Sequence, residues 1–182
     1  GKPVSIFGDK PVYSKEEWAL VARGFNEMGR LAREKDMIFT VHHHMGTGVQ
    51  TEEEIDRLME LTDPNLVYLL YDTGHLAFSG EDALRVLRKY AKRVKHVHLK
   101  SVRNDVVAKA KAGGYSFLDA VRAGAFTVPG DGDFDFQPVF DILAENGYEG
   151  WVVVEAEQDP AKANPFEYAV MAREYIRRTE GL

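Results

Sequence analysis

The sequence predicts an α/β fold in which parallel strands alternate with helices. Short β-rich runs alternate with longer amphipathic patterns five times along the 182 residues, which is typical of β-α-β units. Several of the longer patterns begin with Ser or Thr followed three residues later by an acidic residue, the signature of a helix start. A composition that is 45% hydrophobic and 29% charged indicates one globular domain over residues 1–182.

The predicted strands are apolar runs rich in valine, isoleucine, leucine and tyrosine. They comprise residues 4–7, 37–41, 66–71, 94–99 and 151–154. Because each strand is separated from the next by a helical segment, neighbouring strands should pair in parallel.

The predicted helices cover residues 15–35, 51–61, 79–92, 138–146 and 165–178. Their N-cap candidates are Ser14, Thr51 and Ser79, each with an acidic residue three positions later. The rhythm breaks at about 102–136, where an insertion contains two short helical patterns and a turn-rich stretch. This segment is far longer than an ordinary connection, and loops of such length often form lids.

Charge and composition exclude several classes of function. A formal net charge of −6, with no basic cluster free of carboxylates, argues against nucleic acid as a partner. No apolar run approaches the roughly 18 residues of a membrane span, and residues 1–8 lack a signal-peptide design, so we expect a cytoplasmic protein. The absence of cysteine leaves His, Asp and Glu as the metal ligands the chain can offer.

All the histidines fall at or near the carboxyl end of a predicted strand, and none falls on a predicted helix. They are His42, His43, His44, His75, His96 and His98. In parallel α/β folds, catalytic and ligand-binding groups converge at that edge of the sheet. Histidines without a function would be scattered over helix surfaces and loops, so their placement favours an active site.

Strand parity indicates which of these side chains share a face, because positions two apart point the same way. His42 should therefore lie with His44, and His96 with His98, whereas His43 should face the opposite side.

Two carboxylates end strands in the same manner. Asp72 and Glu155 follow apolar strands directly, where an isolated buried charge needs a partner or a metal. With His42 and His98 they would form a ligand set of two nitrogens and two oxygens, at spacings of 30, 26 and 57 residues. Imidazole and carboxylate ligands suit Mn²⁺, Co²⁺, Fe²⁺ or Zn²⁺ without selecting among them.

Five stretches carry a resemblance to a known family. They are His-His-His-Met-Gly-Thr at 42–47, Tyr-Asp-Thr-Gly-His at 71–75, His-Val-His-Leu-Lys at 96–100, Phe-Thr-Val-Pro-Gly-Asp-Gly at 126–132 and Gly-Trp-Val-Val-Val-Glu-Ala-Glu-Gln-Asp-Pro at 150–160. Together they resemble the myo-inosose-2 dehydratases, which belong to the xylose-isomerase-like (β/α)₈ barrels. The resemblance matches the later part of such a TIM barrel, so we expect about five β-α units, with about three earlier units missing.

The resemblance implies a metal site on His42, Asp72, His98 and Glu155, holding Mn²⁺ or Co²⁺, with Zn²⁺ or Fe²⁺ as alternatives. Isomerase and epimerase relatives have a glutamate at the first of these positions. His42 therefore disfavours mechanisms that use two metal-bound glutamates.

The implied activity is that of a hydro-lyase that removes water from 2-keto-myo-inositol, a cyclic ketopolyol, in inositol catabolism. A metal that polarises the ketone would acidify the adjacent C–H, and a general acid would assist departure of the hydroxyl. The expected catalytic residues are Glu155, Glu157 and His75. The expected substrate-binding residues are His44, His75, Lys100 and Arg103.

Two alternatives remain at this point. One is a sugar isomerase or epimerase of the same barrel class. The other is a truncated barrel that serves as an inactive fragment or binding module, because five strands cannot close a cylinder that usually takes about 250 residues. In that case a further chain, such as a second copy in a homo-oligomer, could fill the gap.

Overall fold

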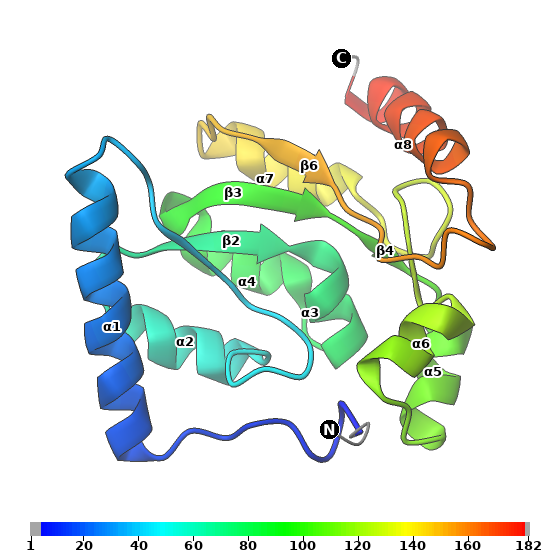
Figure 1. The fold of residues 1–182 in the computed structure, drawn as a ribbon. Coiled ribbons are helices and arrows are strands. Elements are labelled where there is room, and N and C mark those ends of the chain that lie inside the picture. Colours follow the sequence, from blue (N-terminus) through cyan, green and yellow to red (C-terminus); the bar gives the residue numbers. More distant parts are fainter. Residues whose placement is uncertain (1–4, 181–182) are drawn as a thin grey trace.

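A computed structural model describes residues 5–180, whose centre is a 4-stranded sheet. Its strands are β1 (Thr40–His42), β2 (Tyr68–Asp72), β3 (Val94–Leu99) and β6 (Val152–Val154), in that order across the sheet. All neighbouring pairs are parallel, as predicted. Strands β2, β3 and β6 point the same way in Figure 1, and β1 pairs in parallel with β2, so the carboxyl ends of all four form one edge of the sheet.

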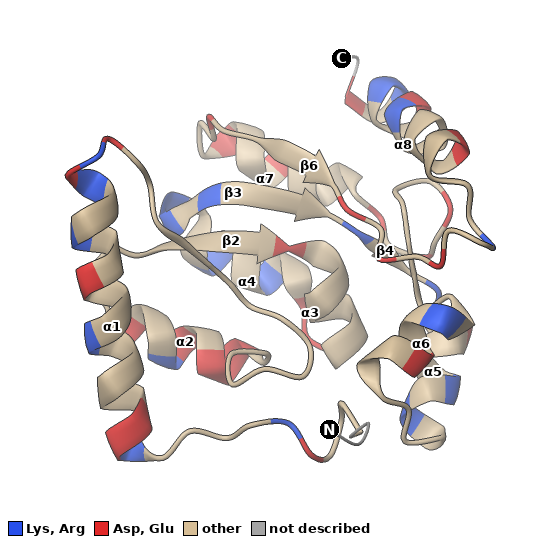
Figure 2. Ribbon diagram, viewed as in Figure 1, with Lys and Arg blue, Asp and Glu red and all other residues tan. Residues whose placement is uncertain are grey.

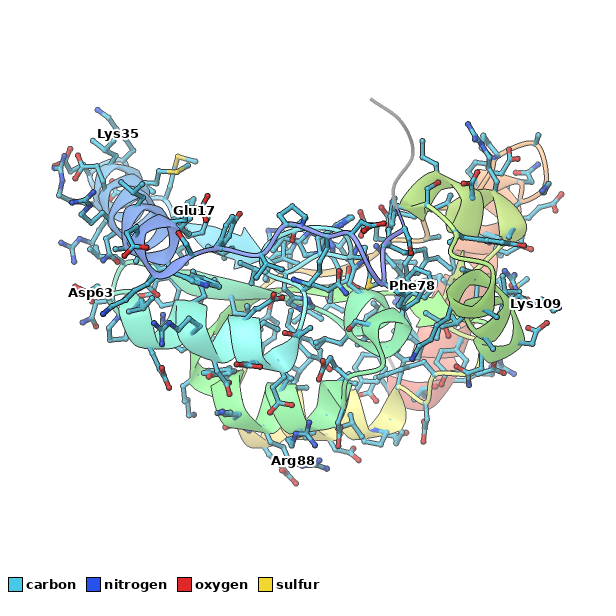
Figure 3. All side chains as sticks on the ribbon, turned by 90° about the horizontal axis from the view of Figure 1, so that it is seen from below. Glu17, Lys35, Asp63, Phe78, Arg88 and Lys109 are labelled. Atoms are coloured by element: carbon cyan, nitrogen blue, oxygen red, sulfur yellow. The ribbon has the colours of Figure 1, made fainter. Side chains whose placement is uncertain are left out.

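Helices cover one face of this sheet. They are α2 (Glu52–Leu61), α4 (Ala83–Tyr90) and α7 (Gln137–Glu145), and Figure 3 shows them as a layer beneath the strands. A short 3-10 helix, Ala91–Arg93, connects α4 to β3. In Figure 1, helix α1 (Lys15–Arg33) lies on the side where β2 and β3 begin, and α8 (Pro165–Glu180) lies past the arrowhead of β6. Within residues 5–180, no comparable helical layer covers the opposite face.

The main core fills the space between the sheet and the covering helices. Its fully buried side chains include Ile55, Leu58, Leu69, Tyr71, Val86, Leu87, Val97 and Leu99. Burial of a large apolar side chain contributes roughly 1.5–3 kcal/mol, so these contacts hold the strands in register. No helix among the described residues is both long and apolar enough to cross a membrane.

Two of the three predicted N-cap residues are confirmed by the structure. Ser14 and Glu17 form a capping box before α1, and Thr51 and Glu54 form one before α2. The third prediction is wrong, because Asp82 caps α4 and Ser79 instead donates its hydroxyl to the carbonyl of Leu76. An Asp side chain competes effectively with Ser for the N-cap position, so the local pattern was ambiguous.

The predicted strand at 4–7 is also wrong. Position 4 lies outside the described residues, and Ile6, Phe7 and Gly8 form a turn in which the N–H of Asp9 donates to the carbonyl of Ser5. Ile6 is buried and its N–H donates to the carbonyl of Tyr115, so the apolar side chain packs against the insertion rather than in a sheet. A short apolar run predicts burial but cannot by itself specify a strand.

Strand β2 runs directly into a helix that the sequence did not predict. This helix, α3 (Thr73–Ser79), is capped by the carboxylate of Asp72, which accepts the N–H of His75. The helix ends at Gly80, whose φ of 88° lies in the left-handed region that glycine adopts without strain because it lacks a Cβ. His75 therefore lies on a helix, contrary to the expectation that no histidine does.

The insertion contains the two predicted short helices, α5 (Asn104–Ala112) and α6 (Phe117–Ala123). They lie between β4 (Ser101–Val102) and β5 (Phe126–Thr127), an antiparallel pair that the sequence did not predict. A second apolar core joins this segment to α3 and to the segment before α1. Its buried members are Ile6, Met45, Phe78, Val102, Ala110, Ala120, Ala125 and Phe126.

Two glycines of α1 provide a matched test of how this helix packs. A Cβ at Gly29 would overlap the carbonyl oxygen of Leu66 and lie 2.8 Å from its carbonyl carbon, whereas a Cβ at Gly24 would meet nothing within 4 Å. We expect Gly29→Ala to lower the free energy of unfolding by about 1–3 kcal/mol through overpacking. Gly24→Ala should raise it by up to about 1 kcal/mol through helix propensity. Urea unfolding of both variants measures the difference, and equal effects would contradict the packing.

Candidate active site and metal centre

Charged side chains gather at the carboxyl edge of the sheet. Figure 2 shows acidic segments at the ends of β2 and β6 and a basic segment at the end of β3. These segments contain Asp72, Glu155, Glu157 and Lys100. The parallel register places them together, because Asp72 lies opposite His98 and Leu99 lies opposite Val154.

The structure brings together the four residues predicted as metal ligands. The Nε2 atom of His42 lies 3.4 Å from Oδ2 of Asp72, and Nδ1 of His98 lies 3.4 Å from the same oxygen. The Nδ1 atom of His98 also lies 3.1 Å from Oε2 of Glu155. The four side chains come from four different strands or strand ends, as parity predicted.

These residues fit a divalent cation. Oδ2 of Asp72 and Nε2 of His42 are buried without a hydrogen-bond partner among the described residues, which is costly for groups of this polarity. One potential ligand atom from each of His42, Asp72, His75 and Glu155 lies within 4.8 Å of the others. Two imidazoles and two carboxylates are a donor set that Mn²⁺, Co²⁺ or Zn²⁺ accepts. This group contains His75 in place of the predicted His98, whose Nδ1 contacts the carboxylates of Asp72 and Glu155.

Asp72 also organises the backbone around the site. Its Oδ1 accepts the N–H of His75 at 2.9 Å, and its own N–H donates to Nε2 of His43 at 3.1 Å. His43, predicted to face away from His42, is fully buried in this supporting position. Burial alone would raise the pKa of Asp72, but His42, His98, His75 and Lys100 together hold it well below its usual range.

Lys100 lies at the centre of the cluster and is fully buried. Its Nζ is 2.5 Å from Oε2 of Glu157, 2.7 Å from Oε2 of Glu155 and 2.9 Å from Nε2 of His75. Oδ2 of Asp72 is 3.5 Å away. Burial would lower the pKa of the ammonium, but Asp72 and Glu157 outweigh it and raise the pKa, so Lys100 is a fixed positive charge.

A second group of potential ligands adjoins the first. His44 Nε2 lies 3.5 Å from Oε1 of Glu157, and His75 Nε2 lies 3.3 Å from Oε2 of the same carboxylate. The rings of His44 and His75 are 3.8 Å apart, and those of Phe117 and Phe126 from the insertion pack against them. The sequence predicted each of these three polar residues as a site residue without grouping them. Strand parity could not have found this group, because Glu157 lies after the end of β6 and has φ 35°, outside the strand conformation.

Arg103 is the one predicted site residue that the structure places elsewhere. Its guanidinium donates to the carbonyls of Gly124 and Phe126 and to Thr127, and it pairs with Asp131. Every one of these contacts lies within the insertion. The contacts therefore support a role in holding the insertion together rather than in binding substrate.

The remaining ionisable groups follow from their surroundings. His98 lowers the pKa of Glu155 to about 2, with help from Lys100. Burial raises the pKa of Glu157, but His44, His75 and Lys100 reverse that effect and hold it well below normal. Burial lowers the pKa of His75 to about 4. The site thus presents ionised carboxylates, a neutral His75 and a charged Lys100 at neutral pH.

These shifts predict that the metal-free protein is most stable near pH 6.5. Burial lowers the pKa of His43 to about 3 and that of His75 to about 4. Below pH 6.5 these two imidazoles therefore become protonated in the unfolded chain while they stay neutral in the folded protein. Stability should fall with acidification, by up to about 1.4 kcal/mol per pH unit for each histidine. Burial opposes protonation of His98, but Asp72 and Glu155 raise its pKa to about 9, so its contribution is lost as pH rises from 6.5 through 9.

Urea unfolding between pH 4.5 and 9, in the presence of a chelator, measures both effects. His43→Gln should flatten the acid side of the profile and leave the alkaline side unchanged. His98→Gln should do the reverse, so each variant is the control for the other. A profile that neither substitution alters would contradict these assignments.

Known proteins resemble this chain in sequence and in fold. The model of the xylose isomerase-like TIM barrel family matches residues 3–179. The inosose dehydratase of Clostridium tetani is 67% identical over 172 residues, covering 94% of this chain and 58% of that protein. The inosose dehydratase of Geobacillus thermodenitrificans is 64% identical over 177 residues, covering 97% of this chain and 59% of that protein.

Among solved structures, a xylose isomerase-like TIM barrel protein from Mycobacterium smegmatis in complex with magnesium aligns with a TM-score of 0.69 at 17% identity. The alignment covers 94% of this chain and 53% of that one. The chain thus spans less than two thirds of the length of the curated relatives it matches. With a parallel sheet and a site at its carboxyl edge, and with the family match over nearly all its residues, the chain belongs to the xylose isomerase-like TIM barrel family.

Proposed function

We propose that this chain carries the active site of an inosose dehydratase, a hydro-lyase that removes water from 2-keto-myo-inositol. The observation that carries the proposal is the identity of 67% to an inosose dehydratase over a segment that includes the whole histidine and carboxylate cluster. The location would be cytoplasmic and the pathway inositol catabolism, as the resemblance implies.

The proposed metal ligands are His42, Asp72, His98 and Glu155, with Mn²⁺ or Co²⁺ as the ion. A bound divalent cation supplies a Lewis acid that polarises the substrate carbonyl and so acidifies the neighbouring C–H. The orphaned buried atoms of Asp72 and His42 support this assignment, because a cation satisfies both at once.

Glu157 is the better placed of the two candidate bases. It is ionised, because its pKa is held low by His44, His75 and Lys100 against the effect of burial. Glu155 is committed to His98 and to the proposed metal. Glu157 would therefore take the proton from the carbon next to the carbonyl, with Glu155 as the alternative base.

Lys100, His75 and His44 would bind the substrate hydroxyls and assist departure of the leaving group. The lowered pKa of His75 keeps its imidazole neutral, which favours a hydrogen-bonding role over proton donation. Lys100, charged and 2.9 Å from His75, would supply the proton to the departing hydroxyl.

The four-stranded sheet would be one part of a closed barrel. Its outer strands, β1 and β6, each have one unpaired edge among the described residues, and Trp151, Val152 and Val153 are exposed there. A closed parallel barrel leaves no such edge. We propose that further strands, from the same protein or from a second copy in a homo-oligomer, pair with these edges in the active enzyme.

Incubation with inosose and Mn²⁺ tests the proposed activity directly. An enone-type absorbance should develop with the enzyme and not with Asp72→Asn, whose neutral side chain is a weaker metal ligand. Ketose substrates analysed in parallel for isomerised sugars separate the alternative. Isomerisation without dehydration would overturn the proposal, and it would be unexpected with His42 where isomerases have glutamate.

His75→Ala provides a sharper test of the site. We expect turnover to fall by about 10²-fold or more while bound Mn²⁺ stays unchanged, because His75 would contact substrate rather than the ion. His42→Ala, the comparison variant, should lose both bound metal and turnover. If His75→Ala loses metal to the same extent, His75 is a ligand; if it retains turnover, it has neither role.

A further inference from the structure

The stem, the backbone and the ammonium of Lys100 are each held in position by neighbouring residues. Its stem passes over Gly74, where a Cβ would lie 2.5 Å from Cγ of the lysine. The hydroxyl of Thr73 donates to the carbonyl of Lys100 at 2.7 Å and accepts its N–H at 2.9 Å. The ammonium lies 5.1 Å from the centre of the Phe126 ring. These contacts fix the charge at one point.

That point lies between two groups of potential metal ligands. The first group is His42, Asp72, His75 and Glu155, and the second is His44, His75 and Glu157. The Nζ of Lys100 is 2.7 Å from Glu155 in the first group and 2.5 Å from Glu157 in the second. It is 2.9 Å from His75, which both groups share. The ammonium of Lys100 thus contacts a carboxylate oxygen of each group and the imidazole nitrogen that the two groups share.

The balance of fixed charges limits the number of cations. The carboxylates of Asp72, Glu155 and Glu157 carry three negative charges, and Lys100 returns one, which leaves two. One divalent cation neutralises that remainder. A second cation would leave a net charge of about two positive with the lysine and about one positive without it, and unbalanced charge in a largely buried site is costly.

We propose that Lys100 sets the metal content of this site at one ion by holding its ammonium where a second divalent cation would otherwise bind. The inference rests on the proposed metal function. Without the lysine charge, His44, His75 and Glu157 become a second site of two imidazoles and one carboxylate. Such a donor set suits Mn²⁺, Co²⁺ or Zn²⁺.

Mn²⁺ content per chain tests the proposal. Metal-free protein is titrated with Mn²⁺, and the bound ion is measured by calorimetry and by elemental analysis after gel filtration. We expect one ion in the wild type and two in Lys100→Met, which keeps an unbranched stem over Gly74 without the charge. Lys95→Met, an exposed lysine of the same strand, should retain one.

Two more variants make the outcome specific. Lys100→Met combined with Glu157→Gln should return to one ion, because the second site has lost its carboxylate. Lys100→Gln repeats the charge removal with a different side chain, and circular dichroism monitors folding of every variant. A second ion should also restore any stability that loss of the lysine charge removes.

Each result has a definite meaning. Two ions in the wild type, or one ion in both neutral variants, would overturn the inference while leaving the proposed function intact. Failure of both neutral variants to fold in the presence of Mn²⁺ would also overturn it, because the second ion should replace the missing charge. A wild type that binds no ion would overturn the proposed metal function itself.

Discussion

The buried carboxylate of Asp72 is the interaction on which both the local fold and the site depend. One oxygen caps α3 and so converts the end of β2 directly into a helix. The other faces the imidazoles of His42 and His98. A charge with no exposed surface is tolerated because cationic and imidazole groups surround it, and the same surroundings hold it ionised. The side chain of Asp72 therefore both caps a helix and faces the imidazoles of the site.

The charges of the cluster are already fixed in the protein without substrate. Glu155 and Glu157 stay ionised because Lys100 and the histidines lie within hydrogen-bond or ion-pair distance. Fixed charges in a site of low exposure act more strongly than they would in water, and they need no rearrangement during reaction. The cost of burying Lys100 is met by the same carboxylates, so the groups stabilise one another.

The insertion contributes to the site as a folded unit. Its own core joins α3 and the segment before α1, and its aromatic rings at Phe117 and Phe126 form a wall against His44 and His75. Arg103 ties this unit together through contacts with Gly124, Thr127 and Asp131. The walls that would surround a substrate thus come from residues distant in sequence from the strands that carry the ligands.

Local pattern in the sequence determined the parallel strands from about 37 to 154, the main helices and the four residues that meet at the sheet edge. Side-chain period and strand ends depend on near neighbours, which is why His42, Asp72, His98 and Glu155 could be selected together. Only the tertiary structure decided that residues 6–8 form a turn with Ile6 buried, that α3 follows Asp72 directly and that Arg103 holds the insertion together. It also decided that Lys100 lies between two ligand groups, because that position depends on the gap at Gly74 and on carboxylates 55 and 57 residues further along the chain.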